Sequence, residues 1–189
     1  MVKKHIIGFF KDAIQSFDID SGAVRVSIVL IGDDAKTQFH LNQVTKKKKL
    51  LKALRSIKAK QYRAKKASLI NLMTTLKSDV LIEANGDRPD VPNIVVVIND
   101  IETKDDVNQM LRLSSDFKQG NDRIVAIGVE SSSPTEMGAL GQGYSDTHYY
   151  NGDKYDYLTK STDLRTSLAN SFKICKFQSI YNNLFEIDT

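Results

Sequence analysis

Asn93-Ile94-Val95-Val96-Val97-Ile98 is the stretch of sequence that decides the fold. An unbroken run of branched apolar residues predicts a strand that is covered on both faces, as in the interior of a parallel sheet. Arg123–Val129 predicts a second strand of the same kind. Between the two runs a helical apolar pattern, opened by Thr103 or Lys104, ends at Gly120. Strand, helix and strand in this order indicate the α/β class.

The rest of the chain continues the alternation of strands and helices. Upstream, the apolar spacing predicts a helix over residues 2–16, a strand over residues 24–30, an antiparallel edge strand at Thr37–Leu41, a helix capped by Thr45 and a helix near Lys66–Ser78. Downstream, it predicts a short helix after Pro134, a weak strand around Thr147–Tyr150 and a helix near Thr162–Cys175. We therefore expect a doubly wound fold, with a central, mostly parallel sheet flanked by helices.

Charge is distributed unevenly along the 189 residues, although the formal net charge is only +4. Residues 46–66, the basic sector, hold eleven lysines and arginines and no acid, whereas the other 168 residues hold 16 cations and 23 acids. Repulsion among close like charges is tolerated more readily when an anionic partner relieves it. The basic sector is therefore either a solvated helix face or a surface for an anionic partner.

Composition excludes several classes of protein. The single cysteine, Cys175, rules out an internal disulfide framework and a multi-cysteine zinc site. It is either a small buried side chain or half of a disulfide whose partner lies outside this chain. The longest strongly apolar run, Ile94–Ile98, is far shorter than the roughly 20 residues that a membrane span requires. We expect one globular domain without a membrane span.

Signals of catalysis are weak. Gly138, Gly141 and Gly143 do not follow a strand into a helix as a dinucleotide-binding loop would, so a glycine-rich turn is the better interpretation. The three histidines fall in separate predicted elements, with no cysteine or serine at the spacing of a nucleophile. We therefore expect a protein that is not an enzyme.

Several separated blocks, in a consistent order, resemble the von Willebrand factor type A domain. Arg88–Asp100 with Lys104–Val107 is similar to the family's fourth strand and following helix, and Arg123–Val129 to its fifth strand. Residues 17–29 and 35–41 resemble its second and third strands. The resemblance is greatest to the matrilin and collagen VI branch, and it covers roughly residues 2–176.

The central first strand that the resemblance implies is absent before Val2. Residues 180–189, which read Ile-Tyr-Asn-Asn-Leu-Phe-Glu-Ile-Asp-Thr, resemble such a strand instead. We therefore expect a type A-like domain over residues 1–176 and a C-terminal segment over residues 177–189. Residues 182–187 are expected to fill the central position, in the same chain or swapped from a neighbour. The chain is then either a fragment of a tandem array or a permuted arrangement.

The resemblance also implies a metal-ion-dependent adhesion site, but this sequence keeps little of it. The Asp-x-Ser-x-Ser motif is missing, Ala64 stands in the place of a threonine ligand, and Ile101 replaces the usual glycine after Asp100. A hard cation needs about six oxygen ligands. Asp100 and Asp188 could supply two, with Asp33 or Asp34 as a third through water. We expect a degenerate site and no cofactor, with Mg²⁺ or Ca²⁺ as the open alternative; otherwise Asp100 is a loop carboxylate paired with a lysine.

The resemblance implies a secreted, extracellular module that binds collagen or other matrix proteins, in a tandem array or by self-association. In a doubly wound fold the loop that contains Arg63, Lys65 and Lys66 lies at the carboxyl ends of the strands, where such sheets bind ligands. We expect these residues and Lys60 to contact an anionic partner, such as a sulfated glycosaminoglycan or an acidic protein. The alternative is an intracellular scaffold of the same fold that binds nucleic acid or acidic proteins.

Overall fold

The computed structural model describes residues 2–15, 17–32, 34–57, 67–118, 122–130, 132–141, 149–152 and 158. In chain order its helices and strands are α1 (Val2–Gln15), β1 (Ile28–Leu30), β2 (Lys36–Phe39), α2 (Lys47–Ser56), α3 (Leu69–Thr75), the π-helix η2 (Leu76–Val80), the 3-10 helix η3 (Glu83–Asn85), β3 (Ile94–Asn99), α4 (Val107–Lys118), β4 (Arg123–Val129), α5 (Pro134–Gly141) and β5 (Tyr149–Gly152). None of the helices among these residues has the length and apolar character of a membrane span.

The two β-branched runs form neighbouring strands of a parallel sheet in the order β3-β4-β5, with β4 in the middle. Strand β3 pairs with β4 over its whole length, from Ile94 opposite Arg123 to Asn99 opposite Gly128. Strands β1 and β2 form a separate antiparallel pair. The predicted α/β class, with a parallel sheet and an antiparallel edge, is confirmed.

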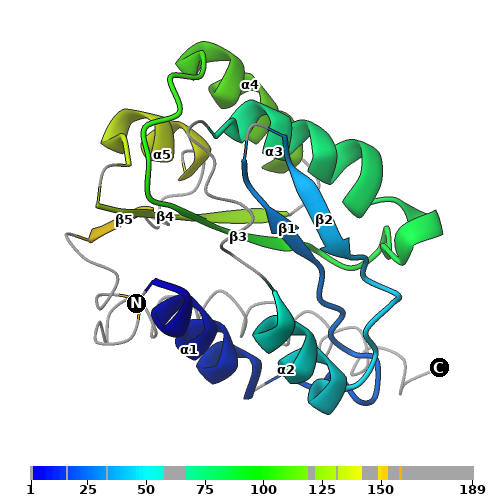
Figure 1. Ribbon diagram of the computed structural model, residues 1–189. Helices are drawn as coiled ribbons and strands as arrows, with labels where there is room; N and C mark the ends of the chain where they lie inside the picture. The colour runs from blue at the N-terminus through cyan, green and yellow to red at the C-terminus, as the bar shows by residue number, and fades with distance from the viewer. Residues whose placement is uncertain are drawn as a thin grey trace, which may run out of the picture.

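Helices cover both faces of the sheet (Figure 1): α3, α4 and α5 lie on one side and α1 and α2 on the other. Side chains of β3 and β4 alternate between these layers, as the pleat of a strand requires. Val97 and Ile124 pack with Met73 and Met110 on the first side. Val125 and Ile127 pack with Phe9 of α1 on the other.

Two helix starts differ from those that the sequence predicts, and each difference has its own structural cause. Helix α2 has Lys46 rather than Thr45 as its N-cap, because the carboxylate of Asp20 accepts the backbone N–H of Lys47 at 2.9 Å and supplies the cap from elsewhere. Helix α4 begins at Val107 rather than at Thr103 or Lys104, since Lys104 has a φ of 60°.

Other boundaries moved by a few residues. Of the strand predicted over residues 24–30, only Ile28–Leu30 forms. The hydroxyl of Ser27 donates a hydrogen bond to the carbonyl of Phe39, and the register shifts after Ile28. The edge strand runs over residues 36–39 instead of 37–41, and the helix expected from Lys66 begins at Leu69, after the N-cap Ser68. The C-terminal helix and residues 182–187 lie outside the described residues.

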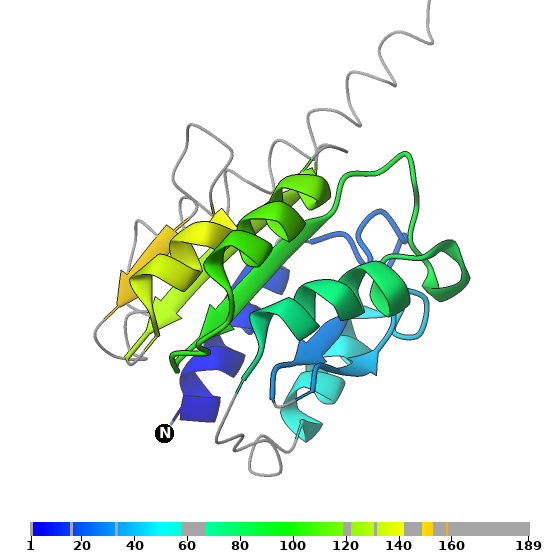
Figure 2. The same cartoon turned by 90° about the horizontal axis from the view of Figure 1, so that it is seen from above.

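Strands β1 and β3 run side by side in the same direction without being paired (Figure 2). At their amino ends, the guanidinium of Arg88 donates to the carbonyls of Gly22, at 3.2 Å, and Ala23, at 2.9 Å. Beyond their carboxyl ends, Ser68 donates its backbone N–H to the carbonyl of Gly32 at 3.2 Å and its hydroxyl to Asp105 at 3.1 Å. These links tie the two sheets together at both ends.

Candidate functional site

The carboxyl ends of β1, β3 and β4, here called the exit edge, are where an open parallel sheet binds ligands. At the end of β3 the side chain of Asn99, which is 4% exposed, donates to the carbonyl of Ile101 at 2.6 Å. This bond turns the chain sharply out of the strand. The half-buried Asp100 stands at the turn, and the loop of residues 101–106 then crosses the exit edge.

A buried glutamate fixes that loop. Glu136 of α5 is 4% exposed, and its two carboxylate oxygens accept the backbone N–H groups of Thr103, at 2.8 Å, and Lys104, at 2.6 Å. These bonds give the carboxylate partners in the interior, where an unpaired polar group would be costly. The bonds also satisfy two donors in a loop that has no secondary structure of its own.

Asp105 holds the start of α3. One carboxylate oxygen accepts the backbone N–H groups of Leu69, at 2.5 Å, and Ile70, at 3.1 Å, and the other accepts the hydroxyl of Ser68. The carboxylate therefore occupies the positive end of that helix and fixes the chain that follows the basic sector. The exit edge is thus built from internal contacts between acids and backbone amides.

The donor set of the described part of the exit edge does not fit a divalent cation. Within the described residues, no three His, Cys, Asp or Glu side chains gather closely enough to hold a metal ion. The carboxylates of Asp105 and Glu136 already accept backbone amides, and Asp100 has an interaction within the chain. Asp188 and Asp33 lie outside the described residues, whereas Asp34 is exposed. The pairing of Asp100 with Asp188 stays a prediction.

The basic sector is described as far as helix α2. Lys48, Lys49 and Lys52 are exposed on this helix and have no ion-pair partner in the part of the chain that the structure describes. Lys46 and Lys47, by contrast, donate to the main-chain carbonyls of Asp20 and Gln15. All four predicted partner-binding residues lie outside the described residues, between α2 and α3: Lys60, Arg63, Lys65 and Lys66.

One histidine, carboxylate and hydroxyl do come together, but in the wrong order for catalysis. Asp79 accepts the hydroxyl of Thr37 at 2.6 Å, while its other oxygen lies 3.8 Å from the imidazole of His40. In an acid–base triad the imidazole stands between the hydroxyl and the carboxylate. Here the carboxylate stands between the other two, so the hydroxyl has no base. The group ties β2 to η2.

Two side chains at the opposite edge of the sheet, where the strands begin, have shifted pKa values. Burial raises the pKa of Asp122, although its carboxylate accepts the backbone N–H of Asn93 at 2.6 Å, a bond that lowers the pKa. Burial lowers the pKa of Arg88, and the positive charge of Arg25 lowers it further. Both side chains hold the amino ends of the strands in place, at the edge opposite the exit edge.

Sequence reasoning missed the two acids that build the exit edge. Glu136 carries no local signal, because the amides that it binds lie 32 and 33 residues away in the sequence. In the sequence, Asp105 stands out only as a member of the block Lys104–Val107 that resembles the family. Its neighbour Asp106 caps α4 by accepting the backbone N–H of Gln109 at 2.7 Å. An acid shortly before a predicted helix is a cap signal that would have suggested one of these roles.

Comparison with known proteins gives consistent matches. The family model for the von Willebrand factor type A domain matches residues 3–164. The human collagen alpha-1(XX) chain is 26% identical over 132 residues, and bovine matrilin-1 is 26% identical over 155 residues. The matches cover 70% and 80% of this chain, respectively, but only 10% and 27% of those proteins.

Solved structures show the same fold. Proximal thread matrix protein 1 from the mussel byssus superposes with a TM-score of 0.77 at 18% identity, over 89% of this chain and 42% of that one. A structure of the same mussel protein with zinc in its MIDAS motif, the metal-ion-dependent adhesion site, superposes with a TM-score of 0.73 at 17% identity. The match covers 88% of this chain and 42% of that one. The manganese-loaded TRAP protein of Plasmodium vivax gives 0.61 at 13% identity, over 82% of this chain and 62% of that one.

Proposed function

This chain belongs to the von Willebrand factor type A domain family, and on that premise we propose that it is a non-catalytic adhesion module of the extracellular matrix. Its relatives include matrilin and collagen chains. We propose that the protein is secreted and that it binds matrix proteins or their anionic components through the basic sector. Tandem repetition or self-association would raise the strength of such binding through multivalency.

The observation that carries this proposal is the contrast between the acids and the cations. Two described acids of the exit edge, Asp105 and Glu136, are occupied by amides of the chain itself. Lys48, Lys49 and Lys52 have no such partners among the described residues. A surface of this kind attracts an anion directly, without a bridging metal ion. Lys60, Arg63, Lys65 and Lys66 extend the same charge along the sequence toward α3, which begins at the exit edge.

The partner chemistry follows from the kind of cation. Lysine is a compact charge on a flexible stem, suited to a dense and irregular row of anions, whereas bidentate recognition of one carboxylate or phosphate favours arginine. The basic sector holds nine lysines and two arginines. A sulfated glycosaminoglycan, or the acidic stretch of a matrix protein, presents such a row of anions.

Retention on immobilised heparin and on immobilised collagen across a salt gradient tests the proposal. The test variant changes Lys60, Arg63, Lys65 and Lys66 to Ser, and the control variant changes four exposed cations from other elements, Lys11, Lys36, Lys77 and Arg112, to Ser. Both lose the same net charge. We expect the test variant to elute at lower salt and its salt dependence to become shallower by roughly one unit of log–log slope per lost contact, while the control stays near the parent.

Two results would decide against the proposal. Equal retention of the parent and the test variant would remove anion binding through these four residues. Equal loss in the test and control variants would show that net charge, and not the basic sector, is responsible. A third column with duplex DNA addresses the intracellular alternative: tighter retention on DNA than on heparin, at the same salt, favours a nucleic-acid scaffold over a matrix module.

A further inference from the structure

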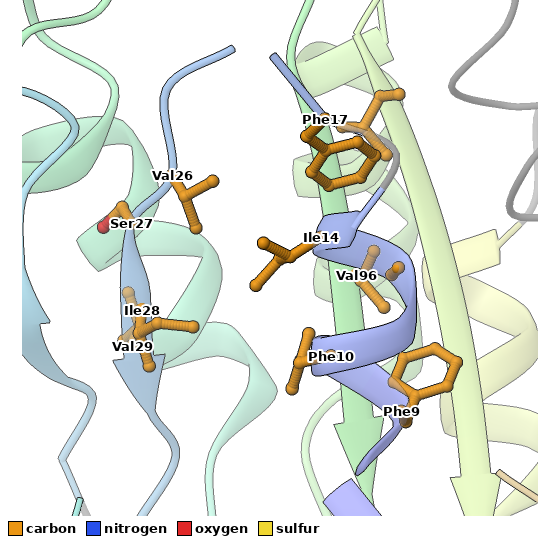
Figure 3. A pocket seen from close by; sticks show the side chains of 11 residues that line it. Phe9, Phe10, Ile14, Phe17, Val26, Ser27, Ile28, Val29 and Val96 are labelled. Atoms are coloured by element: carbon orange, nitrogen blue, oxygen red, sulfur yellow. The ribbon is translucent and has the colours of Figure 1, made fainter. Parts of the chain in front are cut away.

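A channel separates β1 from β3 and passes between the two helical layers. On the α1 side it contains a cavity of about 170 Å³, lined by Phe10 and Ile14 of α1 and by Phe17 from the segment after this helix (Figure 3). On the α3 side lies a second cavity of about 140 Å³, lined by Leu72, Leu76 and Val80 among others. Both cavities are lined by Val29 of β1, by Ser27 just before this strand, and by Ile94 and Val96 of β3. We call this channel the strand slot.

Backbone groups on both sides of the strand slot lack a partner strand among the described residues. Strand β1 pairs only with β2, and β3 pairs only with β4, so one edge of each faces the slot. Unpaired backbone amides and carbonyls in an apolar interior are costly, and native proteins pair almost all of them.

Burial of the flanking side chains points the same way. Val95 and Val96 lie in the middle of β3 and between two helical layers, yet they are only half-buried. Their partners across the ladder, Ile124 and Val125, are 0% and 1% exposed. Strand β1 is half-buried throughout. Apolar surface of β1 and β3 is therefore left exposed along the slot, on both faces of the sheet, as if one element were missing.

An additional strand fits the slot. It would satisfy the free edges of β1 and β3 together, and its alternating side chains would enter the cavity on each face. Since both faces are apolar, the segment must be rich in large apolar residues and short, about as long as the six residues of β3.

The sequence outside the described residues offers one segment of this kind. Residues 58–66 carry five cations, and residues 142–148 and 153–157 contain no aliphatic residue larger than glycine. The pattern of residues 162–175 predicts an amphipathic helix. Residues 182–187 read Asn-Asn-Leu-Phe-Glu-Ile, and three of the last four residues are large and apolar. We propose that residues 182–187 of the same chain insert into the strand slot and complete one continuous sheet from β2 to β5.

The tether is long enough for insertion within one chain. Leu158 is buried against Phe9 and Val125, so the chain is anchored on the α1 side of the sheet at that residue. Twenty-three residues separate Leu158 from Asn182. With residues 162–175 helical and the other nine extended, they span up to roughly 50 Å. Attachment within one chain raises the effective concentration of the segment at the slot, which favours the chain's own segment over one from a second copy in dilute solution.

Cross-linking of the full chain tests the placement. In a Cys175→Ser background, Val96→Cys is combined with Leu184→Cys in one protein and with Phe185→Cys in another, because alternation brings one of the two to the face of Val96. The control combines the same two positions with Lys36→Cys on β2. We expect a disulfide at monomer mass in one Val96 pair and in neither control. A disulfide at dimer mass means that a second copy fills the slot, and no disulfide in either Val96 pair means that the segment lies elsewhere; either result overturns the proposal.

Stability of full-length point variants gives a readout that does not depend on cross-linking. Glu186 is the polar residue in Leu184–Ile187, and insertion would place its charge beside apolar walls. Glu186→Val should therefore shift the urea midpoint upward, and Phe185→Asp should shift it downward. The matched control, Asn182→Asp, changes charge at the segment's end and should change the midpoint less. If neither Glu186→Val nor Phe185→Asp moves the midpoint, the segment is outside the slot.

Discussion

The buried carboxylate of Glu136 accepts the backbone N–H of Lys104 at 2.6 Å, and Lys104 is held there in the left-handed region, with a φ of 60°. Helix α5 thus fixes the loop that leaves β3, although the two are far apart in sequence. The same loop carries Asp105, which caps α3. One buried acid therefore determines the position of the chain at the centre of the exit edge.

Replacing Glu136 with Ala should strongly destabilise the protein. The change leaves the amides of Thr103 and Lys104 without acceptors, at a cost of roughly 1–3 kcal/mol for each buried group. We expect a loss of about 2–5 kcal/mol in the free energy of unfolding, measured by urea denaturation. Glu83→Ala, at an exposed acid, is the control. A loss below about 1 kcal/mol would show that water satisfies these amides.

Lys104→Gly should have the opposite effect. A residue with a side chain is strained at a φ of 60°, and glycine is not. The Lys104 side chain is exposed, so little packing is lost. We expect a gain of about 0.5–1 kcal/mol in the free energy of unfolding. Lys104→Ala, which keeps the strain, should give no gain, and an equal gain in both variants would contradict the explanation.

Gly128 and Ser132 should be energetically coupled. A Cβ atom at Gly128 would lie 2.4 Å from the hydroxyl oxygen of Ser132, which is buried and has no hydrogen-bond partner in the described part of the chain. Gly128→Ala should therefore destabilise by about 1–3 kcal/mol, the usual cost of overpacking. Ser132→Ala alone should be nearly neutral and should rescue most of the loss in the double variant. Additive effects in a double-mutant cycle would exclude the contact.

The strands were predictable because their signal is local. Arg123–Val129 was predicted with the bounds that β4 has, and α5 starts at Pro134 as expected. These elements are specified by composition and periodicity within a few residues. The bonds of Glu136 and Asp105 each join residues more than 30 apart in sequence, so no window of sequence contains them. The start of α4 was wrong for the same reason, since Glu136 holds Lys104 outside the helix.

Asp122 should make stability depend on pH. Burial raises its pKa in the folded protein above the ordinary value of 3.8, so folding favours the protonated form. The contribution of this group to stability is fully present below pH 3.8 and is lost as the pH rises through the raised pKa of the folded state. Asp122→Asn keeps an oxygen for the N–H of Asn93 and removes the charge. We expect this variant to be more stable than the parent at pH 7, with a difference that disappears in acid. Urea titrations from acid to neutral pH measure the difference, and a constant difference would exclude titration of Asp122 as its cause.

Mg²⁺ or Ca²⁺ should change neither the stability of the protein nor its retention on heparin. A hard cation needs about six oxygen ligands, and two acids of the exit edge, Asp105 and Glu136, already accept backbone amides. A cation could gain these ligands only by breaking the bonds that position α3 and the loop after β3. Asp188, whose place is a prediction, would add at most one carboxylate.

Thermal unfolding and calorimetric titration, each with the chelated protein as reference, measure the effect of the cation. Asp100→Ala and Asp34→Ala are the matched variants. A binding isotherm in the millimolar range or tighter that Asp100→Ala abolishes and Asp34→Ala preserves would show that the site is functional. It would also make the metal, and not the basic sector, the first candidate for capture of an anionic partner.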